Sequence, residues 1–191
     1  MTARVSRRVA LGALAALAAG CAAPWRPIAR AAGAPFAGTR RLRVMPVEFA
    51  GVRVSGLTEA AWLAEQNDDE KKRFAIAKSE LSRAFADALV AAAAEYAVTI
   101  ERARARDQVA FEIVPRVPTL EPGSFRSPFD TLPSVVLLRV RLVAPSGAAD
   151  EIELESTTQA TQILKGTDDR LRHDGALLGE AFAAYLKTRL V

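Results

Sequence analysis

Residues 135–155, VVLLRVRLVAPSGAADEIELE, contain two runs of alternating residues separated by a turn signal. In the first run the aliphatic residues at even positions share one side, while Arg139 and Arg141 lie on the other. In the second run Ile152 and Leu154 alternate with three glutamates. A period of two on both sides of a Pro-Ser-Gly turn predicts an antiparallel hairpin with one buried face.

The same pattern fixes the register of this hairpin. Both aliphatic sets reach the core only if paired residue numbers have an even sum, because a slip of one residue turns every side chain over. Arg141 is therefore predicted to lie opposite Glu153 or Glu151. Exposed pairs of this kind contribute well under about 1 kcal/mol each, so we interpret this charge ladder as structural.

Upstream, residues 42–49 alternate and predict a first strand, placed at a sheet edge because Pro46 lacks an N–H. Thr58 is expected to cap a short helix that ends near Gln66. A long helix is expected to follow, with Asn67 and the acidic residues 68–70 at its start, where the helix dipole favours the acids. Its apolar residues recur at helical spacing from Phe74 to Tyr96.

The remaining elements are predicted from shorter patterns. Residues 97–103 and 109–113 have β character, and the second of these strands is expected to end at Pro115. Thr157, Thr158 and Thr161 extend the hairpin's second strand. Asp174 is expected to cap a last helix.

These elements predict an α+β, two-layer fold. We expect a mostly antiparallel sheet of four to five strands with two helices on one face, in the order β-α-β-β-β-β-α, forming a single domain over residues 40–191.

Two surfaces are candidates for contact with a partner. Residues 115–133 contain five prolines, and we expect them to form neither helix nor central strand. Phe125 and Phe129 in this segment are candidate contact residues, although it is also compatible with a plain crossover. Arg102, Arg104 and Arg106 alternate with alanines, which indicates either an anion-binding stripe or a solvated strand face.

The N-terminal residues are typical of an export signal. Arg4, Arg7 and Arg8 precede an uncharged run that ends Leu-Ala-Ala-Gly-Cys at Cys21, and the run is too short to span a bilayer. An ordinary helix start with a buried thiol is the alternative, and the adjacent arginines leave general and twin-arginine export both open. The small residues before Cys21 resemble a bacterial lipobox, which implies a signal peptide over residues 1–20 and acylation of Cys21, palmitate included. Ala22 then implies retention at the outer membrane, facing the periplasm.

Residues 21–39 contain prolines and glycines without a sustained period. They are interpreted as a flexible tether or as an arm packed on the domain. Without residues 1–20 the chain has 23 basic and 22 acidic side chains, a formal charge of +1. Such a balance gives no reason to expect nucleic-acid binding.

Catalytic and cofactor patterns are missing from the sequence. His173 is the single histidine, and no Gly-x-Ser-x-Gly elbow or phosphate-binding glycine loop accompanies it. One histidine without a free cysteine does not make the usual zinc sets, and the acidic pair Asp168 and Asp169 lacks the alternation of a calcium loop. We therefore expect no enzyme activity, no metal and no cofactor.

Four segments together resemble a known class of protein. They are LRVMPVEF (residues 42–49), the Ala-rich helix 74–96, AFEIVP (110–115) and AAYLKTRL (183–190). They are similar to uncharacterised Gram-negative envelope lipoproteins, whose domains are similar to small α/β domains of secretion or transport accessory lipoproteins. The resemblance implies a non-catalytic binding or accessory domain, anchored to the membrane through Cys21, with an envelope protein or its own copies as partner.

Two alternatives to this function stay open. One is a small-molecule or lipid carrier, whose ligand would lie between the sheet and the helices. The other is an envelope hydrolase that uses carboxylates such as Glu151 and Glu153 or Asp168 and Asp169.

Overall fold

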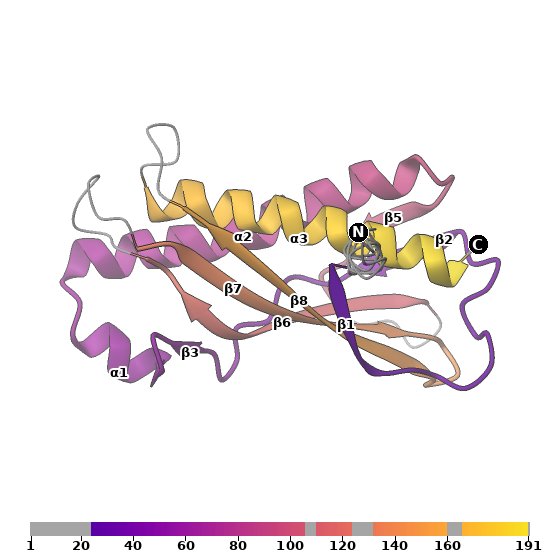
Figure 1. Cartoon of the computed structure of the whole chain (residues 1–191), viewed down its shortest axis with the longest axis horizontal. Helices are drawn as coiled ribbons and strands as arrows, with labels where there is room; N and C mark the ends of the chain where they lie inside the picture. Colours follow the sequence, from indigo (N-terminus) through magenta and orange to yellow (C-terminus); the bar gives the residue numbers. More distant parts are fainter. Residues whose placement is uncertain (1–23, 106–109, 124–131, 160–165, 191) are drawn as a thin grey trace, which may run out of the picture.

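A computed structural model of the chain describes residues 24–105, 110–123, 132–159 and 166–190. In chain order its elements are β1 (Trp25–Ala29), β2 (Arg41–Val44), β3 (Arg53–Val54), β4 (Leu57–Thr58), α1 (Glu59–Ala64), α2 (Asp68–Ala94), β5 (Thr99–Arg102), β6 (Glu112–Glu121), β7 (Ser134–Val143), β8 (Ala149–Thr158) and α3 (Thr167–Leu190). The long helices α2 and α3 lie side by side over one face of the sheet (Figure 1).

The sheet is mixed and larger than the sequence suggests, so the predicted fold class is wrong. It has eight strands in the order β1-β8-β7-β6-β2-β5, with β3 beside β6 and β4 beside β3. Strand β2 runs parallel to both β5 and β6, and β3 runs parallel to β6. Three helices, not two, accompany the sheet in the described residues. The additional strands are short, which is why they leave little periodic signal in the sequence.

The hairpin prediction is confirmed. Strands β7 and β8 pair antiparallel from Ser134–Thr158 to Val143–Ala149, and Arg141 lies opposite Glu151. The turn contains Gly147 with φ 84°, a left-handed conformation in which glycine has no steric penalty. The even positions of β7 are buried and Arg139 and Arg141 are exposed, as the alternation requires.

The helix starts are confirmed in part. Thr58 caps α1 by accepting from the N–H of Ala61. Asn67 caps α2 in a reciprocal capping box with Glu70. Asp174, however, is no cap. Helix α3 begins at Thr167, so Asp174 lies two turns inside it and is fully buried.

Two predictions about strands that were based on prolines are wrong. Strand β2 is internal rather than at an edge, because it ends at Val44 before Pro46 is reached. Strand β6 continues through Pro115 and Pro118 although it is central. Pro118 lies within the register shift of the β6–β7 pairing. On the other side of β6, near Pro115, the single bridge Glu48–Arg116 is the only continuation of the sheet among the described residues. Neither proline therefore interrupts a regular ladder.

The segment that we interpreted as tether or packed arm is in part a strand. Trp25–Ala29 forms β1 and pairs antiparallel with β8 at the edge of the sheet. Trp25 contacts the ring of Tyr185 in α3 edge-on, with centroids 5.7 Å apart. Residues 1–20 and Cys21 lie outside the described residues. Within the described ranges, none of the helices combines the length and hydropathy needed to span a bilayer.

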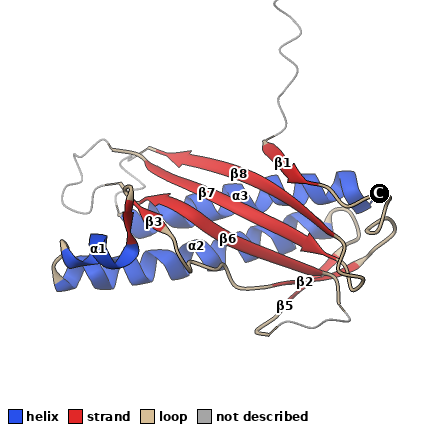
Figure 2. Cartoon of the chain, turned by 90° about the horizontal axis from the view of Figure 1, so that it is seen from below, coloured by secondary structure: helices blue, strands red, loops and turns tan. Residues whose placement is uncertain are grey.

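The core lies between the sheet and the two long helices. Gly175 and Gly179 let α3 approach α2 closely, because a Cβ at these positions would lie 2.5 Å from the carbonyl oxygens of Leu81 and Phe85 respectively. The aliphatic and aromatic side chains of this layer are almost fully buried, Leu138, Phe85 and Phe182 among them. No helix covers the opposite face of the sheet in the part of the chain that the structure describes (Figure 2).

Candidate binding surface on the open sheet face

The buried carboxylates on the helix side are structural. Asp174 accepts hydrogen bonds of 2.6 Å from the hydroxyls of Ser134, Ser156 and Thr158. All four residues are buried, and the bonds join α3 to strands β7 and β8. Each hydroxyl has the carboxylate as its partner, so this cluster holds the fold together and offers no accessible reactive group.

A second carboxylate ties the far end of α3 to the sheet. Asp150 accepts from Tyr185 at 2.6 Å, from Arg189 Nε at 2.5 Å and from the N–H of Ala31 at 2.8 Å. Burial acts to raise the pKa of Asp150, but these three hydrogen bonds outweigh burial and hold its pKa below the usual value. Burial and the neighbouring carboxylate raise the pKa of Tyr185.

The open face carries a charged set on adjacent strands. Arg116 on β6 lies directly opposite Arg139 on β7, and Arg139 in turn lies opposite Glu153 on β8. Arg139 Nε donates to Glu153 at 3.0 Å, and Arg26 on β1 pairs with the same carboxylate. Burial acts to raise the pKa of Glu153, but the two arginines hold it below the usual range. The predicted charge ladder is therefore present and extends to four strands.

This face is hollowed where β6 and β7 meet. A cavity of about 390 Å³ is lined by Glu48, Val114, Arg116, Pro118, Arg139, Arg141 and Glu151. Arg139, Arg141, Glu151 and Glu153 were predicted from the alternation of the hairpin, whereas Arg116 and Glu48 were not predicted. Arg116 reaches the hollow through the antiparallel pairing of β6 with β7, and Glu48 through its parallel bridge to Arg116. The sequence has no local signal for either pairing.

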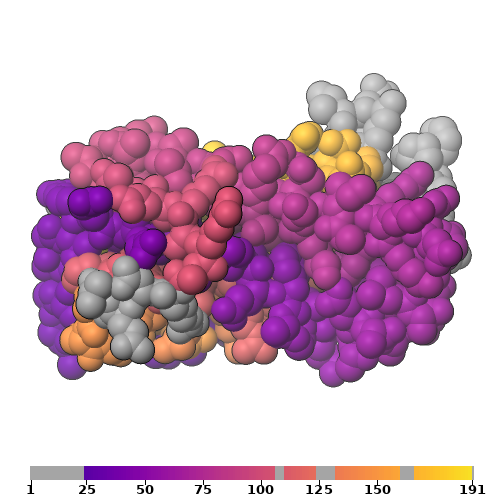
Figure 3. Space-filling view, turned by 180° about the vertical axis from the view of Figure 1, so that it is seen from behind, coloured from indigo at the N-terminus to yellow at the C-terminus, as the bar shows by residue number. Residues whose placement is uncertain are grey.

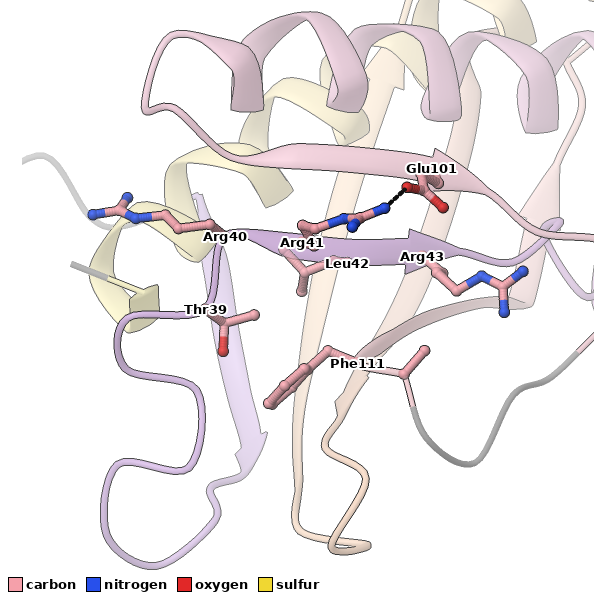
Figure 4. A pocket seen from close by; sticks show the side chains of 8 residues that line it. Thr39, Arg40, Arg41, Leu42, Arg43, Glu101 and Phe111 are labelled. Carbon is pink, nitrogen blue, oxygen red and sulfur yellow. Dashed lines mark hydrogen bonds and ion pairs between the residues drawn. The ribbon is translucent and has the colours of Figure 1, made fainter.

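Two other hollows lie beside strands β2 and β5. One, of about 420 Å³, is lined by arginines 40, 41 and 43 together with Glu101 and Phe111. Figure 4 shows Arg41 pointing toward Glu101, to which it donates at 2.7 Å. Arg40 donates to the carbonyl oxygen of Tyr96. All three arginines of this hollow have partners, whereas Arg141 of the first hollow forms no ion pair within the described residues. This hollow is therefore a weaker candidate for an anion site.

The other hollow is apolar in character and lies between α2 and residues 44–49. It measures about 440 Å³ and is lined among others by Met45, Pro46, Phe49 and Ala86, with Lys78 at its side. Figure 3 shows the face of the molecule on which β5, residues 45–54 and α2 meet. The Lys78 ammonium lies 5.4 Å from the Phe49 ring centroid and 5.2 Å from that of Phe74, a cation–π arrangement.

The candidate contact residues from the sequence are not brought together in the described chain. Arg102 ends β5 and forms an ion pair with Asp87 of α2, so it is held against the helix. Arg104 is exposed beyond that strand. Arg106, Phe125 and Phe129 lie outside the described residues.

The residues weighed for catalysis fall into two groups, one on α3 and one on the open face of the sheet. His173 is exposed on α3, and Asp168 and Asp169 occupy the first turn of that helix. Glu151 and Glu153 lie on β8, on the open face. Over the described ranges, no group of three or more histidine, cysteine or acidic side chains is placed to share a metal ion.

Comparison with known proteins gives little beyond this geometry. The chain matches no family model and no curated protein. A PelC dodecamer from Paraburkholderia phytofirmans is similar at 16% identity and TM-score 0.45, over 83% of this chain and 96% of that one. A leucine-to-methionine variant of that dodecamer is similar at 14% identity and TM-score 0.41, over 83% and 95%. Likenesses this distant carry no argument about fold or function.

Proposed function

We propose that the protein is an outer-membrane lipoprotein whose domain is a non-catalytic binding module that engages another component of the cell envelope through its open sheet face. The observation that carries this proposal is the contrast in side-chain pairing. The buried carboxylates on the helix side accept hydrogen bonds that hold the fold together, whereas the open face has a hollow lined by three arginines.

The proposal of a lipid anchor rests on the lipobox-like sequence before Cys21. If residues 1–20 are removed and Cys21 is acylated, only residues 22–24 separate the lipid from strand β1. At about 3.3–3.6 Å per extended residue this linker is short. The domain would then be held close to the membrane by its β1 edge, with the open face free to meet a neighbour.

Cell fractionation with mass spectrometry of Cys21 tests the anchor. We expect the parent protein in the outer-membrane fraction with acylated Cys21, and the Cys21→Ser variant in the soluble fraction. An unmodified thiol on the parent protein would refute the anchor.

Site-specific photocrosslinking in intact cells tests the binding face. A crosslinker at Glu155, which is exposed on β8 of the open face, is compared with one at His173, which is exposed on the helix side. We expect Cys21-dependent adducts from position 155 and few from position 173. Equal or absent adducts at position 155 would remove the open face as the binding surface.

A small-molecule or lipid carrier is the second candidate, and the apolar hollow beside α2 favours it. The layer between sheet and helices does not, because its side chains are 0–2% exposed at Leu138, Phe182 and Leu186. Organic extraction of the purified protein followed by mass spectrometry discriminates the two functions. A stoichiometric apolar ligand that is lost in an Ala86→Trp variant would support the carrier.

A further inference from the structure

The arginine-lined hollow on the open face contains an unfavourable charge arrangement. Arg116 and Arg139 are directly opposed on neighbouring strands, and like charges in this position destabilise a sheet. The repulsion is offset only by partners outside the pair. Arg139 donates to Glu153 at 3.0 Å, and Arg116 donates to the carbonyl oxygen of Ala50 at 3.2 Å. An anion placed beside Arg116 would offset this repulsion.

The turn below β6 holds Arg116 in place. Gly51 has φ 72°, and a Cβ there would lie 3.4 Å from the Arg116 guanidinium. The hydrogen bond to Ala50 keeps the Arg116 side chain over this turn, and the absence of a Cβ at Gly51 leaves it room there. A preorganised guanidinium loses less conformational entropy when a ligand binds.

Arg141 is a further cation in the hollow, without an ion-pair partner among the described residues. It lies directly opposite Glu151 in the hairpin register, and both residues line the hollow. Nevertheless, within the described residues neither Arg141 nor Glu151 takes part in an ion pair. The cross-strand neighbours therefore present one donor group and one acceptor group to the same space.

The mixture of donors and acceptors decides what kind of ligand fits. Guanidinium groups favour carboxylates or phosphates, which they bind with paired N–H donors. Glu151, which lines the same hollow, repels a bare anion but accepts hydrogen bonds from hydroxyl groups. Val114 and Pro118 supply apolar contact for C–H groups. The volume of about 390 Å³ lies within the range of about 300–1,000 Å³ for small-molecule sites.

We propose that this hollow binds an acidic sugar unit of an envelope glycan, with the sugar carboxylate held by Arg116 and Arg141 and its hydroxyls donating to Glu151. The inference rests on the proposed function in one respect, because it names the chemistry of the component that the open face engages. No bond is made or broken in this binding step.

Titration calorimetry of the detergent-solubilised mature protein tests the site. The probes are a trimer of galacturonic acid, the neutral galactose trimer and inorganic phosphate, each at low and at 0.5 M salt. We expect binding of the acidic trimer, weakened by salt because the contacts are exposed charges. Arg141→Gln and Arg116→Gln should each weaken it about tenfold, as the loss of one charge-assisted contact predicts.

The matched control is Arg172→Gln, which removes an exposed arginine from α3 on the other side of the molecule and should leave the affinity unchanged. Equal affinity of the parent and the Arg141→Gln variant would overturn the proposal. Binding of phosphate or of the neutral trimer as tightly as the acidic trimer would also overturn it. If only this titration fails while open-face crosslinks persist in cells, the proposed function stands and the sugar assignment falls.

Discussion

The two faces of the sheet use charge in opposite ways. On the helix side, Asp174 and Asp150 are fully buried, and each accepts three or more hydrogen bonds from neighbouring elements. On the open side the three arginines are exposed and Glu151 is half-buried, and the directly opposed Arg141 and Glu151 form no ion pair within the described chain. Charge that is fully satisfied and buried specifies the fold, whereas exposed and incompletely paired charge is available to a ligand.

This difference has an energetic consequence that mutations reveal. Removing one partner from a buried polar cluster leaves the other groups without a hydrogen-bond partner, because water does not reach them. The free energy of unfolding therefore falls. Removing an exposed charge changes the free energy of unfolding little, because water and salt already screen it. Stability and binding should therefore separate between the two faces.

The largest effect is expected at Asp174. Asp174→Ala leaves three buried hydroxyls without their acceptor and should lower the free energy of unfolding by about 3 kcal/mol or more. Urea unfolding followed by circular dichroism measures it. Glu180→Ala, at an exposed position on the same helix, should change stability by less than about 0.5 kcal/mol. A similar loss in both variants would mean that the cluster has no special role.

The next effect is an acid-dependent loss at Asp150. Its pKa is depressed in the folded protein, so its stabilising contribution is present above the unfolded-state pKa of about 3.9. That contribution is lost as the pH falls through the lower folded-state pKa. Asp150→Asn should cost about 2 kcal/mol at pH 7 and flatten the pH dependence of unfolding below pH about 4. A parental pH profile in Asp150→Asn would contradict the assignment.

A smaller loss is expected where α2 and α3 meet. Gly179→Ala places a Cβ against the carbonyl oxygen of Phe85, so the helices must separate at a cost of about 1–3 kcal/mol. The gain in helix propensity of about 1 kcal/mol offsets part of this cost. As the opposite control, Ala91→Gly on the exposed side of α2 should destabilise by about 1 kcal/mol through propensity alone. Stabilisation by Gly179→Ala in thermal unfolding would show that the close approach is not limiting.

The smallest effect is expected on the open face. Arg116→Thr removes one member of the like-charged pair with Arg139 and should leave the free energy of unfolding unchanged or raise it by up to about 0.5 kcal/mol. Chemical unfolding at low salt, where surface electrostatics are strongest, is the appropriate measurement. A loss above about 1.5 kcal/mol would mean that Arg116 is structural, contrary to its assignment.

Local patterns in the sequence predicted the elements that local forces determine. The β7–β8 hairpin and its register follow from a period of two, and the start of α2 follows from Asn67 and the acids behind it. Three strands were missed: β1 and β3 depend on partners more than 60 residues away, and β4 pairs only with β3. Their own sequences are short and include prolines or glycines nearby, so nothing local distinguishes them from loops.

Asp174 shows the limit of residue-type reasoning most clearly. An acidic residue before an apolar run is typical of a helix cap, yet here the helix begins seven residues earlier and the carboxylate is buried. The three hydroxyls that make this possible come from β7 and β8, and only the fold brings them together. The candidate site shows the same limit. The pattern of one strand predicts Arg139 and Arg141 as a pair, but Arg116 joins them only through the pairing of β6 with β7.

The most direct test of the division between the two faces is the yield of open-face crosslinks in cells for the double variant Arg116→Thr/Arg141→Thr. With the crosslinker at Glu155, the account predicts that the adduct yield falls to about a tenth of the parent yield, as two lost charge-assisted contacts require at minimum. The free energy of unfolding should stay within about 1 kcal/mol of the parent value. An unchanged adduct yield in a folded double variant would contradict the claim that this arginine-lined face is the binding surface.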